Sequence, residues 1–228
     1  MRVEKYIKRY ILHLLYPTRC PVCGERIGCM DDFCGNCRQK LVIYNGSFRP
    51  DGSDGFTAAF TYDDNISPAI MLLKDGICGN AAYALGKALA DRLKSEGLTE
   101  RCDIIIPAPL HKKDKRRRGY NQSELIAGEV SKRLAIPFCT NAVIKRKETR
   151  AQKTLSRMER KINLCGAFSA SRPELIAGKR VLLIDDVCTT GSTLAEITKI
   201  LKENGAEKII CASCCKTPPP SKNEKEVL

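Results

Sequence analysis

The chain has 228 residues, a length that suits one domain of ordinary size and a small additional segment. Hydrophobic residues make up 43% of the sequence and charged residues 29%, which excludes a disordered chain. No apolar run approaches the roughly 18 residues that a membrane-spanning helix needs, so we expect no membrane insertion. The net charge of +13 favours a polyanionic ligand, either phosphate groups or a nucleic acid.

Residues 1–45 form a separate segment with a helix and a cysteine cluster. Residues 1–15 mix charged and apolar side chains, which predicts an amphipathic helix and not a signal peptide. Two Cys-x-x-Cys pairs follow, separated by ten residues. Because two such pairs supply four thiolates to one tetrahedral ion, we predict a structural Zn²⁺ held by Cys20, Cys23, Cys34 and Cys37. Four sulfur ligands leave no open position, which argues against a catalytic zinc.

The other cysteines raise the total to 13, an odd number without a secretion signal. In a reducing compartment this pattern indicates metal binding and not disulfides, so we expect a cytoplasmic location. Cys29, between the two pairs, is either a substitute ligand or a spare thiol. For Cys211, Cys214 and Cys215, apolar packing in a strand is favoured over a second metal site.

Residues 45–55 are rich in Gly, Ser, Asp and Pro and are predicted to be a linker to a second domain at 56–217. In that domain strand and helix patterns alternate. The predicted strands are 56–62, 103–107, 137–144, 180–184 and 208–214, and the predicted helices are 67–73, 81–93, 121–134 and 192–203. This alternation predicts an α/β fold with a mostly parallel sheet flanked by helices. Residues 218–228 are predicted to be a flexible tail.

The most informative stretch is 181–194, in which a buried strand leads to two acids and then to small hydroxylated residues. These residues open a predicted helix, and the N–H groups at a helix N-terminus bind anions. Gly191 permits a close approach of the backbone, and the acids can accept hydrogen bonds from the vicinal hydroxyls of a ribose. An ordinary capped helix would not need this hydroxylated run. We therefore predict a sugar-phosphate site at Asp185, Asp186, Thr189, Thr190, Gly191, Ser192 and Thr193.

Residues 184–193 resemble the signature of type I phosphoribosyltransferases, which binds phosphoribosyl pyrophosphate (PRPP). Several other features are similar to those of the ComF family of competence-associated proteins, from about residue 20 to residue 217. These features are the two cysteine pairs, residues 107–111, residues 118–122, Thr149, Gln152, Leu155, Arg160 and Asn163. The resemblance implies a type I phosphoribosyltransferase-like fold with an N-terminal zinc-ribbon-like segment. It also implies binding of PRPP with Mg²⁺ and a part in natural transformation, with processing of incoming single-stranded DNA.

The resemblance implies that Asp185 and Asp186 hold the ribose hydroxyls while residues 189–193 surround the 5′-phosphate. Cys188 departs from the more usual residues of this loop. A nucleophilic thiolate there would need a lowered pKa, which the neighbouring acids oppose, so we expect Cys188 to be a packing residue.

Two basic segments complete the candidate site. Residues 107–121 carry six Lys or Arg residues against one acid, at a place similar to that of the pyrophosphate loop of the family. Residues 145–163 correspond in position to a loop that closes over the reacting centre in active relatives. With Asp185 and Asp186, the candidates for catalysis are Arg146 and Arg160. Those for pyrophosphate or nucleic acid are His111, Lys112, Arg118, Asn121 and Gln152. A solvated basic loop and a surface arm without a closing motion are the alternatives.

The residues leave two functional classes open. As an enzyme, the protein would transfer phosphoribosyl from PRPP to an unidentified acceptor and release pyrophosphate, through a transition state with oxocarbenium character. As a non-catalytic protein, it would handle single-stranded DNA or sense PRPP, with PRPP, DNA or DNA-uptake proteins as partners. The net charge favours DNA binding, whereas an aromatic content of 6% without Trp argues against a base-stacking platform.

Overall fold

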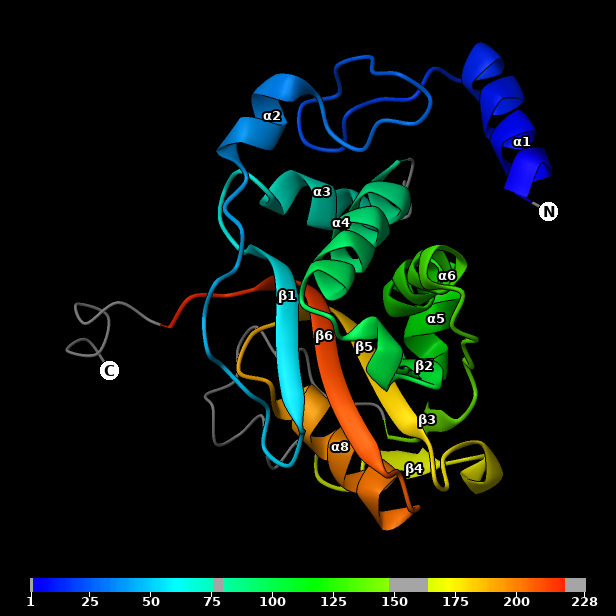
Figure 1. The fold of residues 1–228 in the computed structure, drawn as a ribbon, viewed down its shortest axis with the longest axis vertical. Coiled ribbons are helices and arrows are strands. Elements are labelled where there is room, and N and C mark those ends of the chain that lie inside the picture. Colours follow the sequence, from blue (N-terminus) through cyan, green and yellow to red (C-terminus); the bar gives the residue numbers. More distant parts are fainter. Residues whose placement is uncertain (1, 76–79, 148–163, 220–228) are drawn as a thin grey trace.

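The computed structural model describes residues 2–75, 80–147 and 164–219. At its centre lies a four-stranded sheet in which all neighbouring strands are parallel (Figure 1). The strands follow the order β1 (Gly55–Thr61), β6 (Lys208–Lys216), β5 (Arg180–Cys188) and β2 (Ile104–Pro107). The predicted α/β class with a parallel sheet is therefore confirmed.

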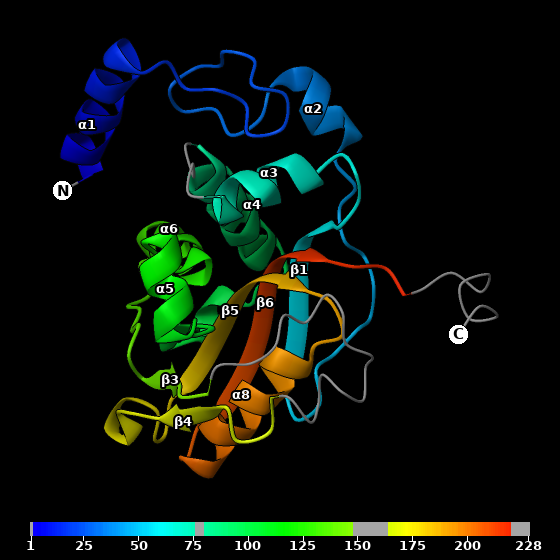
Figure 2. The same cartoon turned by 180° about the vertical axis from the view of Figure 1, so that it is seen from behind.

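Helices cover both faces of the sheet (Figures 1 and 2). On one face lie α3 (Ser67–Lys74), α4 (Ala81–Ser95) and α6 (Gln122–Leu134). On the other lie α8 (Ser192–Glu203) and a hairpin of β3 (Val143–Lys145) and β4 (Phe168–Ala170). Leu182 and Ile184 of β5 point to the first core, whereas Val181 and Leu183 point to the second. A strand buried on both faces is continuously apolar, which explains the pattern of β5.

The N-terminal segment consists of α1 (Arg2–Leu15), the cysteine loops and α2 (Gly35–Lys40). The residues between α2 and the linker run along the outer edge of β1, where the carbonyl of Val42 accepts a hydrogen bond from the N–H of Thr61 (2.8 Å). Ile43 forms an antiparallel bridge with Phe60. An unpaired edge strand invites association with other chains. Because Val42 and Ile43 pair with the edge of β1, they protect the sheet. No helix of the described residues has the length and apolarity to cross a membrane.

The structure corrects several predicted boundaries. The strand predicted at 137–144 is reduced to an isolated bridge at Phe138 and to β3, and β4 was not predicted. The basic segment after β2, predicted as a loop, contains the helix α5 (Lys112–Arg118). Two 3₁₀ helices, η1 (Thr99–Arg101) and η3 (Pro173–Leu175), were also not predicted.

The largest correction concerns β5, which continues four residues beyond its predicted end at Ile184. Its pairing with β6 extends to Cys188 opposite Lys216, because β6 is equally long and satisfies the backbone groups. Asp185 and Asp186 therefore lie within a strand and not in a loop. The rigid sheet fixes both acids.

Candidate functional site

A pocket of about 1000 Å³ lies at the carboxyl ends of β2 and β5, where ligands of open parallel sheets bind. Segments distant in the sequence meet there: the end of α3, the chain from Ala108 to the start of α6, and β5 with its following loop. The two strands of the β3–β4 hairpin contribute Lys145 and Phe168. The pocket is thus lined by residues from several elements of the α/β domain.

One end of the pocket is formed by residues 189–193, which we call the phosphate loop. Gly191 is the N-cap of α8 and has a φ of +79°. A Cβ atom at this position would lie 2.6 Å from Cζ of Phe48, so both the backbone angle and the contact require glycine. Thr189, Gly191, Ser192 and Thr193 line the pocket. The start of α8 therefore faces the pocket with N–H groups suited to an anion.

Thr190 belongs to the phosphate loop but does not line the pocket in the described chain. The Oγ1 atom of Thr190 lies 2.9 Å from Oγ of Ser192 and accepts a hydrogen bond from the backbone N–H of Ser192 at 3.4 Å. The side chain of Thr190 therefore stabilises the turn, and its backbone N–H remains the group that can serve a ligand.

Asp185 and Asp186 lie half-buried in the pocket wall. Oδ1 of Asp185 accepts hydrogen bonds from Oγ of Ser123 (3.0 Å) and from the N–H of Asp186 (2.9 Å). Burial, together with repulsion from Asp186, raises the pKa of Asp185 to about 7. Asp186 forms an ion pair with Lys74, with 3.6 Å between Nζ and Oδ2. Two adjacent carboxylates that repel one another fit a ligand that brings hydroxyl donors or a cation.

The same pair suits the Mg²⁺ that the family resemblance implies, because carboxylate oxygens are the protein ligands that Mg²⁺ prefers. Asp185 and Asp186 would hold the ion either directly or through its water ligands and the ribose hydroxyls. When bound, Mg²⁺ would offset the negative charge of the phosphate groups.

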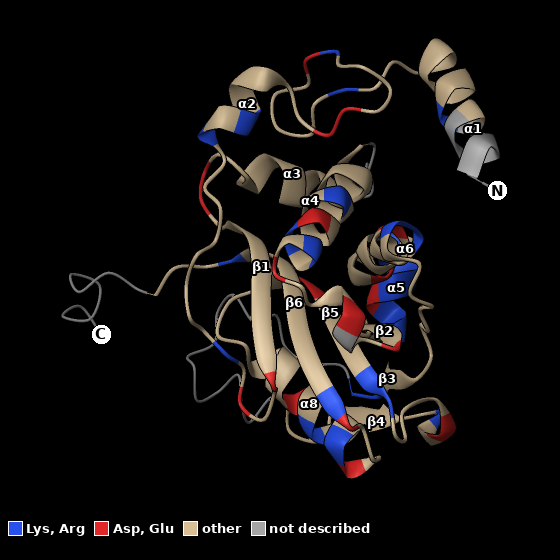
Figure 3. Cartoon of the chain, in the orientation of Figure 1, with Lys and Arg blue, Asp and Glu red and all other residues tan. Residues whose placement is uncertain are grey.

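The opposite end of the pocket is basic. The helix α5 has no buried residue, and its residues are mostly Lys and Arg (Figure 3). Arg117 and Arg118 line the pocket, whereas His111 and Lys112 do not. Arg117 is paired with Asp114 at 2.8 Å. Of the candidates chosen in this segment, Arg118 is thus the cation that the fold brings to the pocket.

Asn121 also lines the pocket, but its side chain has a structural role. It caps α6: Oδ1 accepts from the N–H of Ser123 (3.1 Å), and Nδ2 donates to the carbonyl of Ala108 (2.9 Å). The adjacent Gln122 was not selected from the sequence. It is 3% exposed, lines the pocket, and its Nε2 has no hydrogen-bond partner in the described part of the chain. A buried unpaired amide is costly, so Gln122 is suited to a ligand oxygen.

The β3–β4 hairpin supplies a second residue that was not selected, Lys145. Its ammonium lies 5.8 Å from the ring centroid of Phe168. Burial lowers the pKa of Lys145, and the charges of Asp114 and Asp185 partly offset this effect. Arg146, which was selected, donates from Nε to Oγ of Ser169 (2.6 Å) and is not among the pocket residues. The candidates Gln152 and Arg160 lie outside the described residues.

The four predicted zinc ligands come together in the N-terminal segment. The sulfur atoms of Cys20, Cys23, Cys34 and Cys37 all lie within 4.8 Å of one another. The Sγ atoms of Cys23 and Cys34 are 3.7 Å apart, close to the roughly 3.8 Å expected between ligands of a tetrahedral zinc with bonds near 2.3 Å. The cluster therefore fits Zn²⁺ well, and Cys29 is not part of it.

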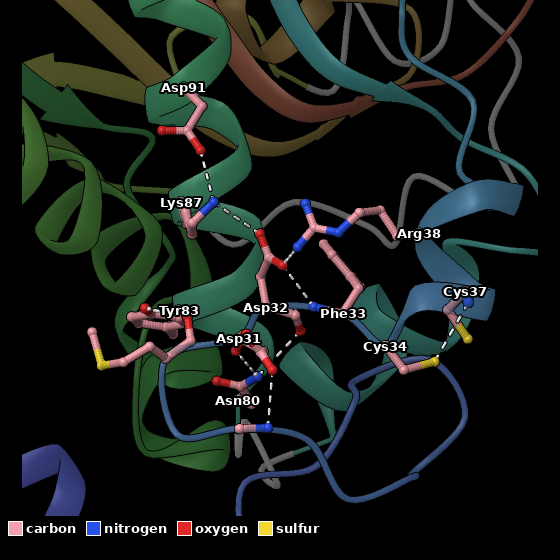
Figure 4. A network of polar contacts seen from close by, with 12 residues as sticks. Asp31, Asp32, Phe33, Cys34, Cys37, Arg38, Asn80, Tyr83, Lys87 and Asp91 are labelled. Atoms are coloured by element: carbon pink, nitrogen blue, oxygen red, sulfur yellow. Dashed lines mark hydrogen bonds and ion pairs between the residues drawn. The ribbon is translucent and has the colours of Figure 1, made fainter.

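A polar network fastens the cysteine segment to α4 (Figure 4). The carboxylate of Asp32, only 3% exposed, pairs with Lys87 at 3.1 Å and with Arg38. Lys87 also pairs with Asp91 at 2.9 Å, and the amide of Asn80 donates to the carbonyl of Asp32 at 3.2 Å. The buried acid pairs with Arg38 within the segment and with Lys87 of α4, so the network orients the segment against the larger domain.

Most of the other described cysteines are buried, whereas Cys139 is partly exposed and Cys165 is exposed. Burial raises the pKa of Cys188 to about 12, as expected for a packing residue beside two acids. Cys211, Cys214 and Cys215 are fully buried in β6. The described residues contain no second cysteine cluster that could hold a metal.

Comparison with known proteins agrees with both parts of the chain. Residues 121–227 match the phosphoribosyl transferase domain, and residues 11–48 match the double zinc ribbon domain. Competence protein F of Haemophilus influenzae is 34% identical over 208 residues, which cover 87% of this chain and 90% of that protein. The DNA utilization protein YhgH of Escherichia coli K12 is 33% identical over 204 residues, or 88% of this chain and 85% of that protein.

Among solved structures, the glutamine PRPP amidotransferase of B. subtilis is similar over 59% of this chain and 27% of its own, with 24% identity and a TM-score of 0.41. The two curated relatives match nearly the whole of this chain, and one domain match lies in each of its two parts. The family resemblance and the fold predicted from the sequence are therefore confirmed. The chain belongs to the ComF family of phosphoribosyltransferase-like proteins with an N-terminal zinc ribbon.

Proposed function

We propose that this protein binds PRPP with Mg²⁺ in the 1000 Å³ pocket and transfers its phosphoribosyl group to an acceptor, with release of pyrophosphate. One observation carries the proposal: the acid pair lies near the end of β5, the phosphate loop comes directly after β5, and both line the pocket. A helix N-terminus suits the 5′-phosphate, and two adjacent acids suit the vicinal hydroxyls of the ribose. The acids come first along the chain and the phosphate loop directly after them, so the two sites are neighbours, as the hydroxyls and the 5′-phosphate are on the sugar.

The residues at the other end of the pocket suit the pyrophosphate. Arg118 and Lys145 bring positive charge, and the unpaired Nε2 of Gln122 can donate to a phosphate oxygen. During transfer the bond from C1 to the pyrophosphate oxygen breaks and positive charge develops on the ribose. The carboxylates of Asp185 and Asp186 stabilise this charge, whereas the cations stabilise the leaving group.

The pocket also has room for an acceptor. Its volume lies at the upper end of the roughly 300–1000 Å³ typical of small-molecule sites. Ser123 holds Asp185 in place and Tyr120 donates to the carbonyl of Leu73 (2.7 Å), so the walls near the ribose are fixed before the ligand arrives. None of these residues selects one acceptor class, so the screen must include both bases and amines.

Calorimetry with PRPP in the presence and absence of Mg²⁺ tests binding, and a pyrophosphate-release screen over nucleobases and amines tests transfer. We expect saturable binding that needs Mg²⁺, and release with one class of acceptor. Binding without release from any acceptor would favour a PRPP sensor over a transferase. Absence of binding at millimolar PRPP would contradict the proposal.

A second candidate function is contact with single-stranded DNA, which is favoured by the exposed cations of α5. This helix has six Lys or Arg residues and one acid, and all lie at the surface or partly exposed. The names of the relatives, a competence protein and a DNA utilization protein, support a link to competence and DNA utilization. Because phosphate contacts release counterions, binding should weaken steeply as salt rises. No binding even at low salt would remove this function.

A further inference from the structure

A buried lysine lies directly behind the phosphate loop. Lys216 is the last residue of β6 and only 7% exposed. It stands opposite Cys188, the last residue of β5, in the parallel ladder. The N–H of Thr217 closes the ladder by donating to the carbonyl of Cys188 at 3.0 Å. Since the backbone already completes the pairing of the two strands, the sheet does not require a charged side chain here.

The ammonium of Lys216 holds the first peptide of the phosphate loop. Its Nζ donates to the carbonyl oxygen of Thr189 at 2.7 Å and to that of Thr217 at 2.7 Å. It also lies 4.5 Å from the ring centroid of Phe48. These contacts replace the water that a buried ammonium loses, so the side chain has one well-defined place.

The direction of this contact matters for the ligand. In a planar trans peptide the carbonyl and the N–H point in opposite directions. When Lys216 binds the carbonyl of Thr189, the N–H of Thr190 on the same peptide points away from the lysine. We propose that Lys216 is a positioning residue, which turns the Thr190 N–H toward the 5′-phosphate and brings a positive charge behind the loop. This inference rests on the proposed function, because it concerns the same site.

Phe48 of the linker completes the support. Its ring packs against Phe56 (5.3 Å between centroids, 89° between planes) and lies where a Cβ of Gly191 would be. The N–H of Phe48 donates to the hydroxyl of Tyr44 at 3.2 Å, which fixes the linker beside the loop. Phe48 therefore contacts both Gly191 and Lys216 and sets the distance between them.

The test measures the affinities of two probes that occupy opposite ends of the pocket, ribose 5-phosphate and Mg²⁺ with pyrophosphate. Lys216→Met removes the ammonium and keeps the length of the side chain. We expect this variant to bind ribose 5-phosphate about 10- to 100-fold more weakly, as for loss of a charged hydrogen bond. Its affinity for pyrophosphate should change less than about twofold. Phe48→Leu should give a smaller loss in the same direction. Lys208→Met, at the other end of β6, is the matched control and should change neither affinity.

The outcomes separate the possibilities. Unchanged ribose 5-phosphate affinity, or an equal loss for both probes, would overturn the positioning role, because a general structural defect affects both ends. If Lys216→Met does not fold, Lys216→Gln takes its place and is judged by the same two affinities. A wild-type protein that binds ribose 5-phosphate but not PRPP would overturn the proposed function and leave this inference standing. A wild-type protein that binds neither sugar phosphate would overturn both.

Discussion

The two ends of the pocket are built in different ways. The phosphate loop is short, follows a buried strand, and offers backbone N–H groups held by the sheet, by Phe48 and by Lys216. The basic end consists of exposed side chains on α5, a helix without a buried residue. Backbone donors fixed by a core recognise one anion in one place. Exposed cations tolerate many polyanions, and salt screens them. We infer that selectivity for the sugar phosphate comes from the first end and affinity for polyanions from the second.

Two glycines provide the sharpest contrast between the ends, since both have a positive φ: +79° at Gly191 and +82° at Gly119. A Cβ at Gly191 would clash with Phe48, whereas nothing lies within 4 Å of a Cβ at Gly119. We expect Gly191→Ala to cost about 2–4 kcal/mol of stability and to weaken PRPP binding at least about 100-fold. Gly119→Ala should cost about 1 kcal/mol, from backbone strain alone. Thermal unfolding measures the stability of the two variants, and calorimetry measures their affinity for PRPP. Equal losses of stability and affinity in the two variants would contradict the contrast.

The acid pair should show a conflict between stability and function. The pKa of Asp185 is raised to about 7 in the folded state. Protonation of this carboxyl group therefore stabilises the fold fully below about pH 4, and this contribution to the free energy of unfolding is lost as pH rises through 7. Asp185→Asn should therefore make the ligand-free protein more stable at pH 8, by about 1–2 kcal/mol, and about equally stable near pH 4. PRPP binding should fall about 100-fold, since the ribose loses a charged acceptor.

Asp103 is the control with the opposite sign. Its hydrogen bonds with Arg180 lower its pKa to about 2. The contribution of this carboxylate to the stability of the fold is present above about pH 4 and is lost as pH falls through 2. Asp103→Asn should therefore reduce the stability at neutral pH and leave PRPP binding unchanged. Denaturant titrations at pH 5 and pH 8 separate the two variants. A stability difference for Asp185→Asn that does not change with pH would contradict the raised pKa.

At the basic end, Arg118 lines the pocket and should contact both kinds of ligand. We expect Arg118→Ala to weaken PRPP binding about tenfold, the effect of one charge-assisted hydrogen bond. Single-stranded DNA should bind less tightly as well. Calorimetry at two salt concentrations checks this, and unchanged PRPP affinity would place the pyrophosphate elsewhere.

Arg116, on the same helix, does not line the pocket and should affect DNA alone. Arg116→Ala should leave PRPP affinity unchanged and reduce the slope of log affinity for DNA against log salt by about 0.7, the value for one phosphate contact to a single strand. Fluorescence anisotropy over a salt series measures the slope. A slope identical to that of the wild-type protein would show that this side of α5 does not contact the single-stranded DNA.

Local features of the sequence predicted the parts of the molecule that depend on few residues. The four cysteines, the strand before Asp185, and α8 over 192–203 were predicted with their correct places. In each case the chemistry lies within a short segment: thiolate spacing, a continuous apolar run, or a glycine cap.

The basic end could not be predicted in the same way, because it depends on which side chains the fold brings together. Sequence reasoning favoured Asn121, which caps α6, and missed Gln122, one residue further along. It selected Arg146, the residue directly after β3, and missed Lys145, the last residue of β3, although only Lys145 lines the pocket. A difference of one residue reverses the direction of a side chain in a strand. Only the tertiary structure decides which of two neighbours faces the ligand.

The most direct test is a crystal structure with PRPP and Mg²⁺ bound. We expect the 5′-phosphate to lie at the N–H groups of residues 190–193, with both ribose hydroxyls at the carboxylates of Asp185 and Asp186. The pyrophosphate should lie near Arg118 and Gln122. If the 5′-phosphate lay at α5 and the diol away from β5, the assignment of the two ends would be contradicted.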